Sequence, residues 1–90
     1  MKLENLLNHL VNSILPEGCS YVVQAKEGEK YVLLQIITDD DRTAAILIGK
    51  RGSTVRALKK IVELWGRVEG KNAVLELVNR VPRSSSREGS

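Results

Sequence analysis

Apolar residues recur every three or four positions at the start of the chain. They are Leu3, Leu6, Leu7, Leu10, Val11 and Ile14. This spacing follows one face of an α-helix, so it predicts a helix that packs on a core through that face. Pro16 and Gly18 come directly afterwards and predict the end of the helix.

Two runs rich in Val, Ile, Leu and Tyr follow, and both have the length of a β-strand. Ser20–Lys26 and Lys30–Thr38 are separated by the polar residues Glu27–Glu29, which predicts an antiparallel hairpin. Within the second run, Val32–Ile37 is apolar on both faces apart from Gln35, although helices need to cover only one of them. An open second face would expose the side chains of Tyr31, Leu33 and Ile37. Such a face is either an ordinary half-solvated sheet or a surface for a partner.

Three successive carboxylates, Asp39–Asp41, precede the next helical pattern. An Asp at a helix start caps the first amide groups and suits the positive end of the helix dipole. We therefore interpret the triplet as a cap rather than as a site for a divalent ion. A short helix is expected over about Arg42–Ile48, and the two glycines of Gly49–Gly52 then interrupt the pattern with a bend.

A second amphipathic helix is expected after the bend, from a cap at Ser53 or Thr54 to about Gly66. One side of this helix is apolar and carries Val55, Leu58, Ile61, Val62 and Trp65. The other side carries Arg56, Lys60, Glu63 and Arg67, with Lys59 near its edge. We expect Trp65 to lie in the core because it falls on the apolar side.

The last periodic segment, Asn72–Asn79, predicts a strand. From Arg80 onward the composition changes to Arg, Ser, Pro and Gly. This change predicts a disordered basic tail over residues 80–90 after one folded domain over residues 1–79. The element order is helix, strand, strand, helix, helix, strand. It predicts an α+β fold in which a three-stranded sheet carries the helices on one face.

Composition narrows the class of protein. Ninety residues with 42% hydrophobic and 28% charged side chains suit one small globular domain. There is one cysteine, Cys19, and no apolar run is long enough to span a membrane. These features predict a cytoplasmic protein with no membrane contact. No zinc-ligand spacing and no nucleophile paired with a base is present, so we expect no metal, no cofactor and no enzymatic activity.

Positive charge is concentrated in one part of the chain. The formal net charge is +3. Residues 80–90 hold three arginines and one glutamate, which leaves +1 for residues 1–79. Six basic residues and no acidic residue lie from Arg42 to Lys60. A negatively charged partner is therefore expected near the glycine bend.

The bend holds Lys50 and Arg51 between its two glycines, at the start of a helix. Two cations are unfavourable there for the helix alone, because its first amide groups already carry partial positive charge. A bound phosphate would reverse this cost, and glycine lets the backbone approach the phosphate closely. The alternative is a plain corner between two helices with solubilising charges.

The segment ILIGKRGSTVRALKKIVELW resembles the core of a KH domain, and Ile48–Gly52 matches the Ile-Gly-x-x-Gly loop of that family. The helix before the strands resembles the bacterial type II arrangement. The small size resembles the single-domain bacterial RNA-binding proteins of the KhpA type. The resemblance covers about Leu3 to Val78. The Asp39–Asp41 triplet and the Arg/Ser tail depart from the small members of the family, and neither touches the loop.

The resemblance implies single-stranded RNA as the ligand, since the G-x-x-G loop of KH domains clamps the backbone of about four nucleotides. Gly49 and Gly52 would admit the phosphates, and Lys50 and Arg51 would supply charge. The other residues that the resemblance implies in RNA binding are Ile48, Ser53, Val55, Arg56, Lys59 and Lys60.

Several of these residues have a structural alternative. Ile48, Val55 and Leu58 would either line an apolar groove bounded by the middle strand or belong to the core. Arg56, Lys59 and Lys60 would either extend the contacts to phosphates or form a solvated helix face.

The resemblance also implies pairing, either as a homodimer or with a larger KH-containing protein, and a role as an RNA chaperone or post-transcriptional regulator. Two other functions fit the pattern of residues. A helix-turn-helix DNA-binding protein would use Ser53–Trp65 as its recognition helix. A protein-interaction adaptor would use the open sheet face at Tyr31 or Leu33.

Overall fold

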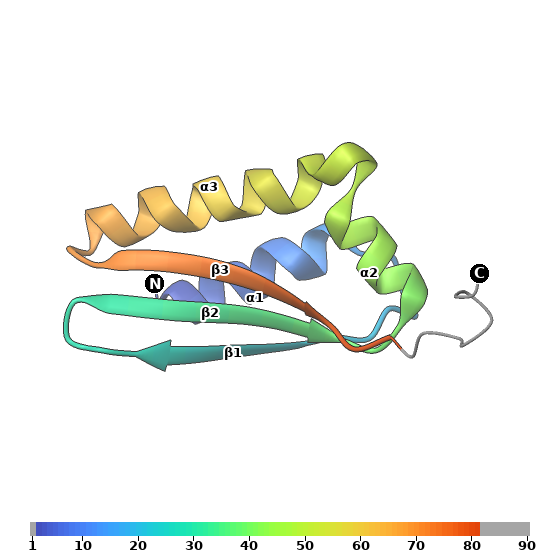
Figure 1. Ribbon diagram of the computed structural model, residues 1–90, viewed down its shortest axis with the longest axis horizontal. Coiled ribbons are helices and arrows are strands. Elements are labelled where there is room, and N and C mark those ends of the chain that lie inside the picture. The colour runs from blue at the N-terminus through green and yellow to red at the C-terminus, as the bar shows by residue number, and fades with distance from the viewer. Residues whose placement is uncertain (1, 82–90) are drawn as a thin grey trace, which may run out of the picture.

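The computed structural model describes residues 2–81 as three helices and one sheet, with a short 3-10 turn between the second and third helices (Figure 1). The elements are α1 (Leu3–Ile14), β1 (Val22–Glu27), β2 (Tyr31–Thr38), α2 (Asp41–Ile48), η1 (Lys50–Gly52), α3 (Ser53–Val68) and β3 (Asn72–Asn79). This order confirms the predicted α+β fold of the type II KH arrangement. The predicted tail lies outside the described residues, except for Arg80 and Val81.

The three strands form one sheet in the order β1-β2-β3. β1 and β2 are antiparallel, as the predicted hairpin requires. β3 runs parallel to β2, because α2 and α3 carry the chain back before it enters the sheet. The register aligns Gln35 of β2 with Gln24 on one side and with Glu76 on the other. Because β3 is last in the strand order, it is an edge strand with no neighbouring strand on its outer side within residues 2–81.

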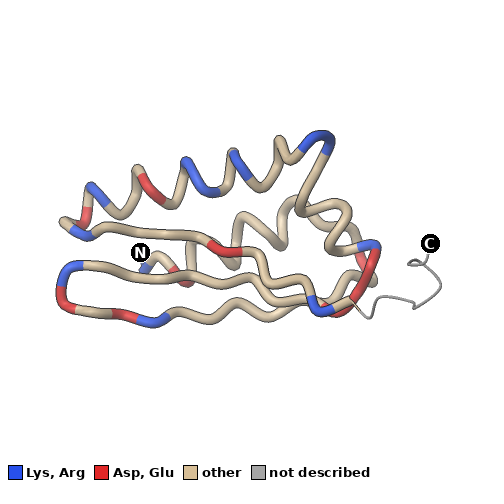
Figure 2. Tube along the Cα trace, in the orientation of Figure 1, with Lys and Arg blue, Asp and Glu red and all other residues tan. Residues whose placement is uncertain are grey.

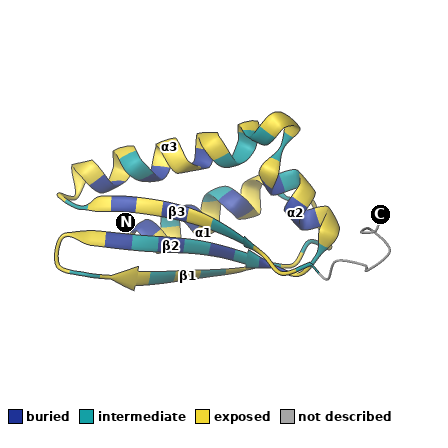
Figure 3. Ribbon diagram, in the orientation of Figure 1, coloured by how far each residue is buried: buried dark blue, intermediate teal, exposed yellow. Residues whose placement is uncertain are grey.

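All three helices lie on one face of the sheet, and that face is the core (Figure 3). Alternate residues of β2 are buried from Val32 to Thr38, as the period of a strand dictates. α1 contributes its predicted stripe through Leu3, Leu7 and Val11. The buried cluster consists of Leu3, Leu7, Val11, Val32, Leu34, Ile36, Leu47, Leu58, Val62, Ala73 and Leu75.

The contact between α3 and β3 depends on a glycine inside the helix. A Cβ atom on Gly66 would lie 2.6 Å from the Cβ of Ala73 and 3.0 Å from the carbonyl oxygen of Lys71. No larger residue fits this close approach without a shift of the backbone. The helix continues past Gly66 to Val68, so the predicted end at about Gly66 was two residues early.

The prediction that Trp65 belongs to the core is wrong, because 36% of this residue is exposed. Leu58, Val62 and Gly66 face the core instead, at intervals of four residues. The close contact of Gly66 with Ala73 fixes the rotation of α3 about its axis. Trp65 then lies beside the buried face of the helix rather than on it. A second apolar stripe results on the outer surface of the helix. This α3 stripe consists of Ile61, Leu64, Trp65 and Val68, which are 39%, 48%, 36% and 80% exposed.

The second face of the sheet is open, which both sequence-based interpretations of that face assumed. Tyr31 and Val74 are each 57% exposed on it, whereas Leu33 and Ile37 are only half-buried. Gln35 Nε2 donates a hydrogen bond of 2.8 Å to Glu76 Oε1 across the middle of this face. A polar row therefore divides the apolar residues of the open face into two smaller groups.

Candidate nucleic-acid interface

The entry to α2 is fixed by the predicted carboxylate cap. Asp40 Oδ2 accepts hydrogen bonds from the backbone N–H of Thr43 at 3.0 Å and from its hydroxyl at 2.5 Å. The side-chain hydrogen bond, followed by the backbone one, lowers the pKa of Asp40 below its ordinary value of 3.8. Thr43 is buried and its Oγ1 accepts from the backbone N–H of Ser20 at 3.1 Å. The cap thus ties α2 to the segment that leads into β1.

Gly49 ends α2 and starts the loop, as predicted. Its N–H donates to the carbonyl oxygen of Ala45 at 3.0 Å, and its backbone lies at φ 75° and ψ 178°. This combination is accessible to glycine and very costly for other residues. A Cβ atom here would also lie 2.7 Å from the Cβ and 2.8 Å from the backbone nitrogen of Thr54. Gly49 is therefore required by conformation and by space.

Two further loop residues, Arg51 and Gly52, are held in left-handed backbone geometry. Gly52 has φ 77° and Arg51, a non-glycine residue, has φ 58°. Arg56, one turn into α3, donates from Nη1 to the carbonyl oxygen of Arg51 at 2.7 Å. This hydrogen bond offsets part of the cost of left-handed geometry at Arg51. The guanidinium of Arg56 is therefore engaged with the loop rather than being only part of a free phosphate track.

The expected cap at Ser53 or Thr54 is wrong. The N-cap of α3 is Gly52, and within residues 2–81 no side chain hydrogen-bonds to the first amide groups of this helix. The N–H of Ser53 donates to the carbonyl oxygen of Lys50. Glycine at this position leaves those N–H groups without a side-chain acceptor, which favours an external anion. Ser53 itself is exposed as the first residue of the helix.

Lys50 and Arg51 are exposed at the tip of the loop. Within residues 2–81 neither side chain forms an ion pair. Figure 2 shows further basic positions recurring along α3 from this loop towards its far end. The loop, the uncapped helix start and this basic row form one positively charged edge of the molecule.

A groove of about 400 Å³ runs between α3 and β3. Its lining residues are Lys59, Glu63, Arg67, Lys71, Asn72, Ala73, Val74 and Leu75. The middle strand, which the sequence analysis expected as the other wall, takes no part in it. The reason is the parallel crossover, which returns the chain to the edge of the sheet and puts β3 alongside α3.

The apolar residues proposed for a groove separate into three environments. Leu58 is buried in the core and 2% exposed. Val55 is half-buried on the next turn towards the loop. Ile48 is 38% exposed at the end of α2, directly before Gly49. Ile48 and Val55 are thus accessible beside the loop, whereas Leu58 is part of the core.

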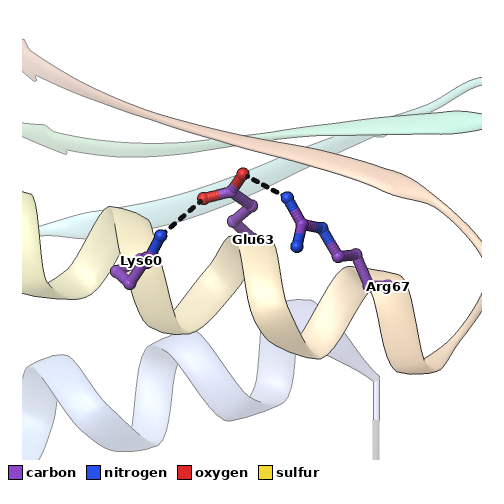
Figure 4. A network of polar contacts seen from close by, with 3 residues as sticks. All are labelled: Lys60, Glu63 and Arg67. Carbon is purple, nitrogen blue, oxygen red and sulfur yellow. Dashed lines mark hydrogen bonds and ion pairs between the residues drawn. The ribbon is translucent and has the colours of Figure 1, made fainter.

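The charged face of α3 contains one acidic side chain in the groove. Glu63 Oε2 accepts from Arg67 Nη2 at 3.0 Å, and Glu63 Oε1 lies 3.9 Å from Lys60 Nζ (Figure 4). Lys60 is therefore paired, while Lys59 lines the groove without an ion pair in the described part of the chain. At the far end, Lys71 Nζ lies 3.5 Å from Glu27 Oε2.

Sequence reasoning missed the far half of this groove. The spacing of Lys59, Glu63 and Arg67 at intervals of four residues indicates one helix face, and the sequence analysis had already placed Glu63 and Arg67 on one side. It could not show that Ala73–Leu75 lies opposite, because that depends on which strand pairs with β2. Among residues 2–81 no cluster of His, Cys, Asp or Glu could hold a metal ion. No helix in that range is long and apolar enough to cross a membrane.

Comparison with known proteins agrees with this architecture. The crystal structure of an Era variant from Aquifex aeolicus, bound to GDP.AlF4-, superposes with a TM-score of 0.59 at 21% identity. The match covers 98% of this chain and 34% of the Era chain, and it supports the fold.

Two sequence comparisons assign the family. The RNA-binding protein KhpA of Aquifex aeolicus (strain VF5) is 40% identical over 52 residues, which is 58% of this chain and 65% of that relative. The alignment thus spans just under two thirds of the relative's length. A family model described as the KH domain of KhpA/KhpB matches residues 4–77. Since this match covers well over half of the chain and reaches into every helix and strand of the fold, the chain belongs to the KhpA/KhpB KH domain family.

Proposed function

We propose that this chain binds single-stranded RNA, with backbone phosphates at the Gly49–Gly52 loop and bases in the groove between α3 and β3. The observation that carries the proposal is the geometry of the loop. Lys50 and Arg51, which form no ion pair within residues 2–81, stand at the tip of a glycine bend at the start of a 16-residue helix that has no side-chain cap in that range. The relative from Aquifex aeolicus is named an RNA-binding protein, in agreement with this assignment.

Each part of the site has a physical role in this proposal. Gly49 and Gly52, at φ 75° and 77°, permit the sharp bend at the helix start where a phosphate would meet the backbone amides. Lys50 and Arg51 neutralise the phosphate charge, and Lys59 extends this attraction into the groove. Ile48 and Val55 offer apolar surface to a sugar or base beside the loop. The residues proposed to contact or shape the RNA site are Ile48, Gly49, Lys50, Arg51, Gly52, Ser53, Val55, Arg56, Lys59 and Lys60.

The two lysines and Arg56 on α3 have different roles in this scheme. Arg56 acts mainly by bracing the carbonyl of Arg51, as their hydrogen bond indicates. Lys60 shares its charge with Glu63 and contributes less than Lys59. We expect weak affinity with modest sequence selectivity, because few aromatic side chains are available for stacking: the chain has two tyrosines and one tryptophan. The proposed biological class is a cytoplasmic RNA chaperone or post-transcriptional regulator without enzymatic activity.

Fluorescence anisotropy of a short labelled single-stranded RNA at several salt concentrations tests the proposal. The natural chain is compared with a double variant, Lys50→Asp and Arg51→Asp, after circular dichroism shows that both are folded. We expect binding by the natural chain, with a slope of log affinity against log salt of about −0.7 per phosphate contact. The double variant should lose this binding. Equal binding by both proteins would contradict the role of the loop.

Unlabelled duplex DNA, added as a competitor, separates this proposal from the helix-turn-helix alternative. An RNA-binding groove for single strands should release little labelled RNA to the duplex. A recognition helix would prefer the duplex, because an α-helix fits the major groove of B-DNA.

The α3 stripe favours a second activity, which is pairing with another KH chain. Ile61, Leu64, Trp65 and Val68 recur at i, i+3, i+4 and i+7 on the outer surface of a long helix. Two such helices bury their stripes against each other in a two-fold pair, since the same surface serves both partners. We propose a second copy of this chain as the partner, with a larger KH-containing protein as the other candidate. Two loops in one assembly would bind a longer RNA with higher avidity.

A further inference from the structure

In the part of the chain that the structure describes, Glu63 is the one acidic residue that lines the groove between α3 and β3. It stands between Lys59 and Arg67, which lie four residues before and after it on the same helix face. A carboxylate at this point repels phosphate, so it weakens a surface whose only task is to attract the RNA backbone. The position of Glu63 therefore suits a hydrogen-bond donor of a ligand better than a phosphate.

The ion pairs of Glu63 do not account for its position. Its contacts with Lys60 and Arg67 are exposed pairs within one helix, and pairs of this kind add little to stability. Figure 4 shows Glu63 between its two cations, with the 3.0 Å hydrogen bond from Arg67 on one side.

Glu63 retains capacity to accept further hydrogen bonds. An ionised carboxylate offers about four acceptor sites on its two oxygens. Arg67 Nη2 occupies one of them at 3.0 Å, whereas Lys60 Nζ, at 3.9 Å from Oε1, is too distant for a hydrogen bond. The side chain is 44% exposed, so donors that enter the groove can reach it.

The wall opposite Glu63 is the edge strand β3, with Ala73, Val74 and Leu75. Ala73 and Leu75 turn their apolar side chains towards the helices, whereas Val74 lies on the open sheet face. The backbone N–H groups of Asn72 and Arg80 point to β2, as their bonds of 2.9 and 2.8 Å to Lys30 and Thr38 show. By the alternation of a strand, the polar backbone groups of Ala73 and Leu75 point to the free edge. A base in the groove would meet polar groups from both walls.

We propose that Glu63 makes the groove selective for bases that present hydrogen-bond donors on their Watson–Crick edge, guanine above all. This inference rests on the proposed function. Guanine carries two adjacent donors, the N1 imino and N2 amino groups, and these match an acceptor-only carboxylate. In uracil the single N3 donor lies between two carbonyl acceptors. In adenine and cytosine the amino group lies beside an acceptor nitrogen.

The test compares three short RNAs that differ at one position: an all-uridine strand, the same strand with one central guanosine, and the same strand with inosine there. Inosine lacks the N2 amino group and keeps the N1 imino donor. For the natural chain, anisotropy should give about ten-fold tighter binding of the guanosine strand than of the all-uridine strand, with inosine between them.

Glu63→Gln removes the charge and replaces one acceptor oxygen by a donor. We expect this variant to bind the guanosine and uridine strands within a factor of about two of each other. Its affinity for the uridine strand should be unchanged or higher, because a repulsive charge is gone. Glu69→Gln is the matched control, since it removes the same charge from the C-cap of α3, outside the groove. This control should keep the preference for guanosine.

The possible results separate the two proposals. If the natural chain binds all three strands equally, or if Glu63→Gln keeps the preference, Glu63 does not read bases and the inference is overturned while RNA binding stands. If none of the three RNAs binds to the natural chain, the proposed function is contradicted, and the inference is contradicted with it. Loss of the preference in both Glu63→Gln and Glu69→Gln would assign it to net charge and also overturn the inference.

Discussion

Arg56 Nη1 donates a hydrogen bond of 2.7 Å to the carbonyl oxygen of Arg51, which is the residue held at φ 58° in the loop. The two residues are five positions apart, so the first turn of α3 braces the loop that precedes it. A cation proposed for phosphate binding is thereby positioned by a second cation. The repulsion between them is small where both side chains are solvated.

Arg56→Gln should weaken RNA binding by more than the loss of one charge. Without this hydrogen bond, worth about 1 kcal/mol, Arg51 leaves its left-handed geometry more often. Arg42→Gln is the matched control, because Arg42 is exposed in the first turn of α2, away from the loop. We expect Arg56→Gln to bind RNA about five-fold more weakly than Arg42→Gln. Faster amide hydrogen exchange in residues 50–53 of the Arg56 variant alone would identify the cause; equal affinity and exchange in both variants would rule out a bracing role.

Replacement of Gly49 by alanine should destabilise the protein strongly. The added Cβ meets the Thr54 side chain and backbone, and the backbone at φ 75° and ψ 178° is unsuited to alanine. We expect a loss of about 2–4 kcal/mol in the free energy of unfolding, measured with urea. Gly70→Ala is a close control, because Gly70 has φ 76° but an added Cβ meets nothing within 4 Å. It should cost only about 1–2 kcal/mol, and equal losses would mean that crowding by Thr54 is unimportant.

Asp40 should make the stability of the fold depend on acidic pH. Its side-chain hydrogen bond from Thr43, then the backbone bond, lowers its pKa in the folded state below 3.8. A group with a lowered folded-state pKa adds stability above its unfolded pKa, and this contribution is lost as the pH falls through the folded-state pKa. Asp40→Asn can still cap α2 through its amide oxygen but does not titrate.

The measurement is the melting temperature of both proteins from about pH 5 downward. The natural protein should be the more stable at the upper end of this range, and its advantage should shrink as the pH drops below 3.8. Melting curves that stay parallel over the whole range would show that protonation of Asp40 is not linked to unfolding.

Leu64→Lys should prevent self-association, since pairing would bury an uncompensated charge in the α3 stripe. Val74→Lys is the control on the open sheet face, where the original side chain has similar exposure: 57% for Val74 and 48% for Leu64. In sedimentation velocity, the natural chain and Val74→Lys should show concentration-dependent pairing, and Leu64→Lys should remain a monomer. Dissociation by Val74→Lys alone would move the interface to the sheet and support the adaptor alternative.

Local features of the chain were predictable because their causes lie within a few residues. The stripe of α1, the hairpin across Glu27–Glu29 and the cap at Asp40 each follow from periodicity or turn chemistry. The same holds for the bend, since glycines that permit positive φ identify Gly49 and Gly52 without knowledge of the fold. Lys50 and Arg51 are exposed at its tip as the sequence predicts, while their contact with RNA stays a prediction.

The features that sequence reasoning missed depend on contacts between distant segments. The hydrophobic pattern of α3 is wide enough to allow several rotations, and only the close approach of Gly66 to Ala73 turns Trp65 outward. The partner of Arg56 was hidden for a similar reason, because the reach of a side chain to a carbonyl depends on the loop geometry.

The sequence by itself determined the order of the elements, the buried faces of α1 and β2, and the glycine bend with its two cations, since each is encoded by neighbours along the chain. Only the tertiary structure decided that β3 lies parallel to β2 at the edge of the sheet, and hence that α3 and β3 enclose the groove. Strand pairing is a choice among segments far apart in sequence, made by the packing of the whole core. That choice brings Glu63 opposite Ala73–Leu75 and creates the groove proposed to select bases.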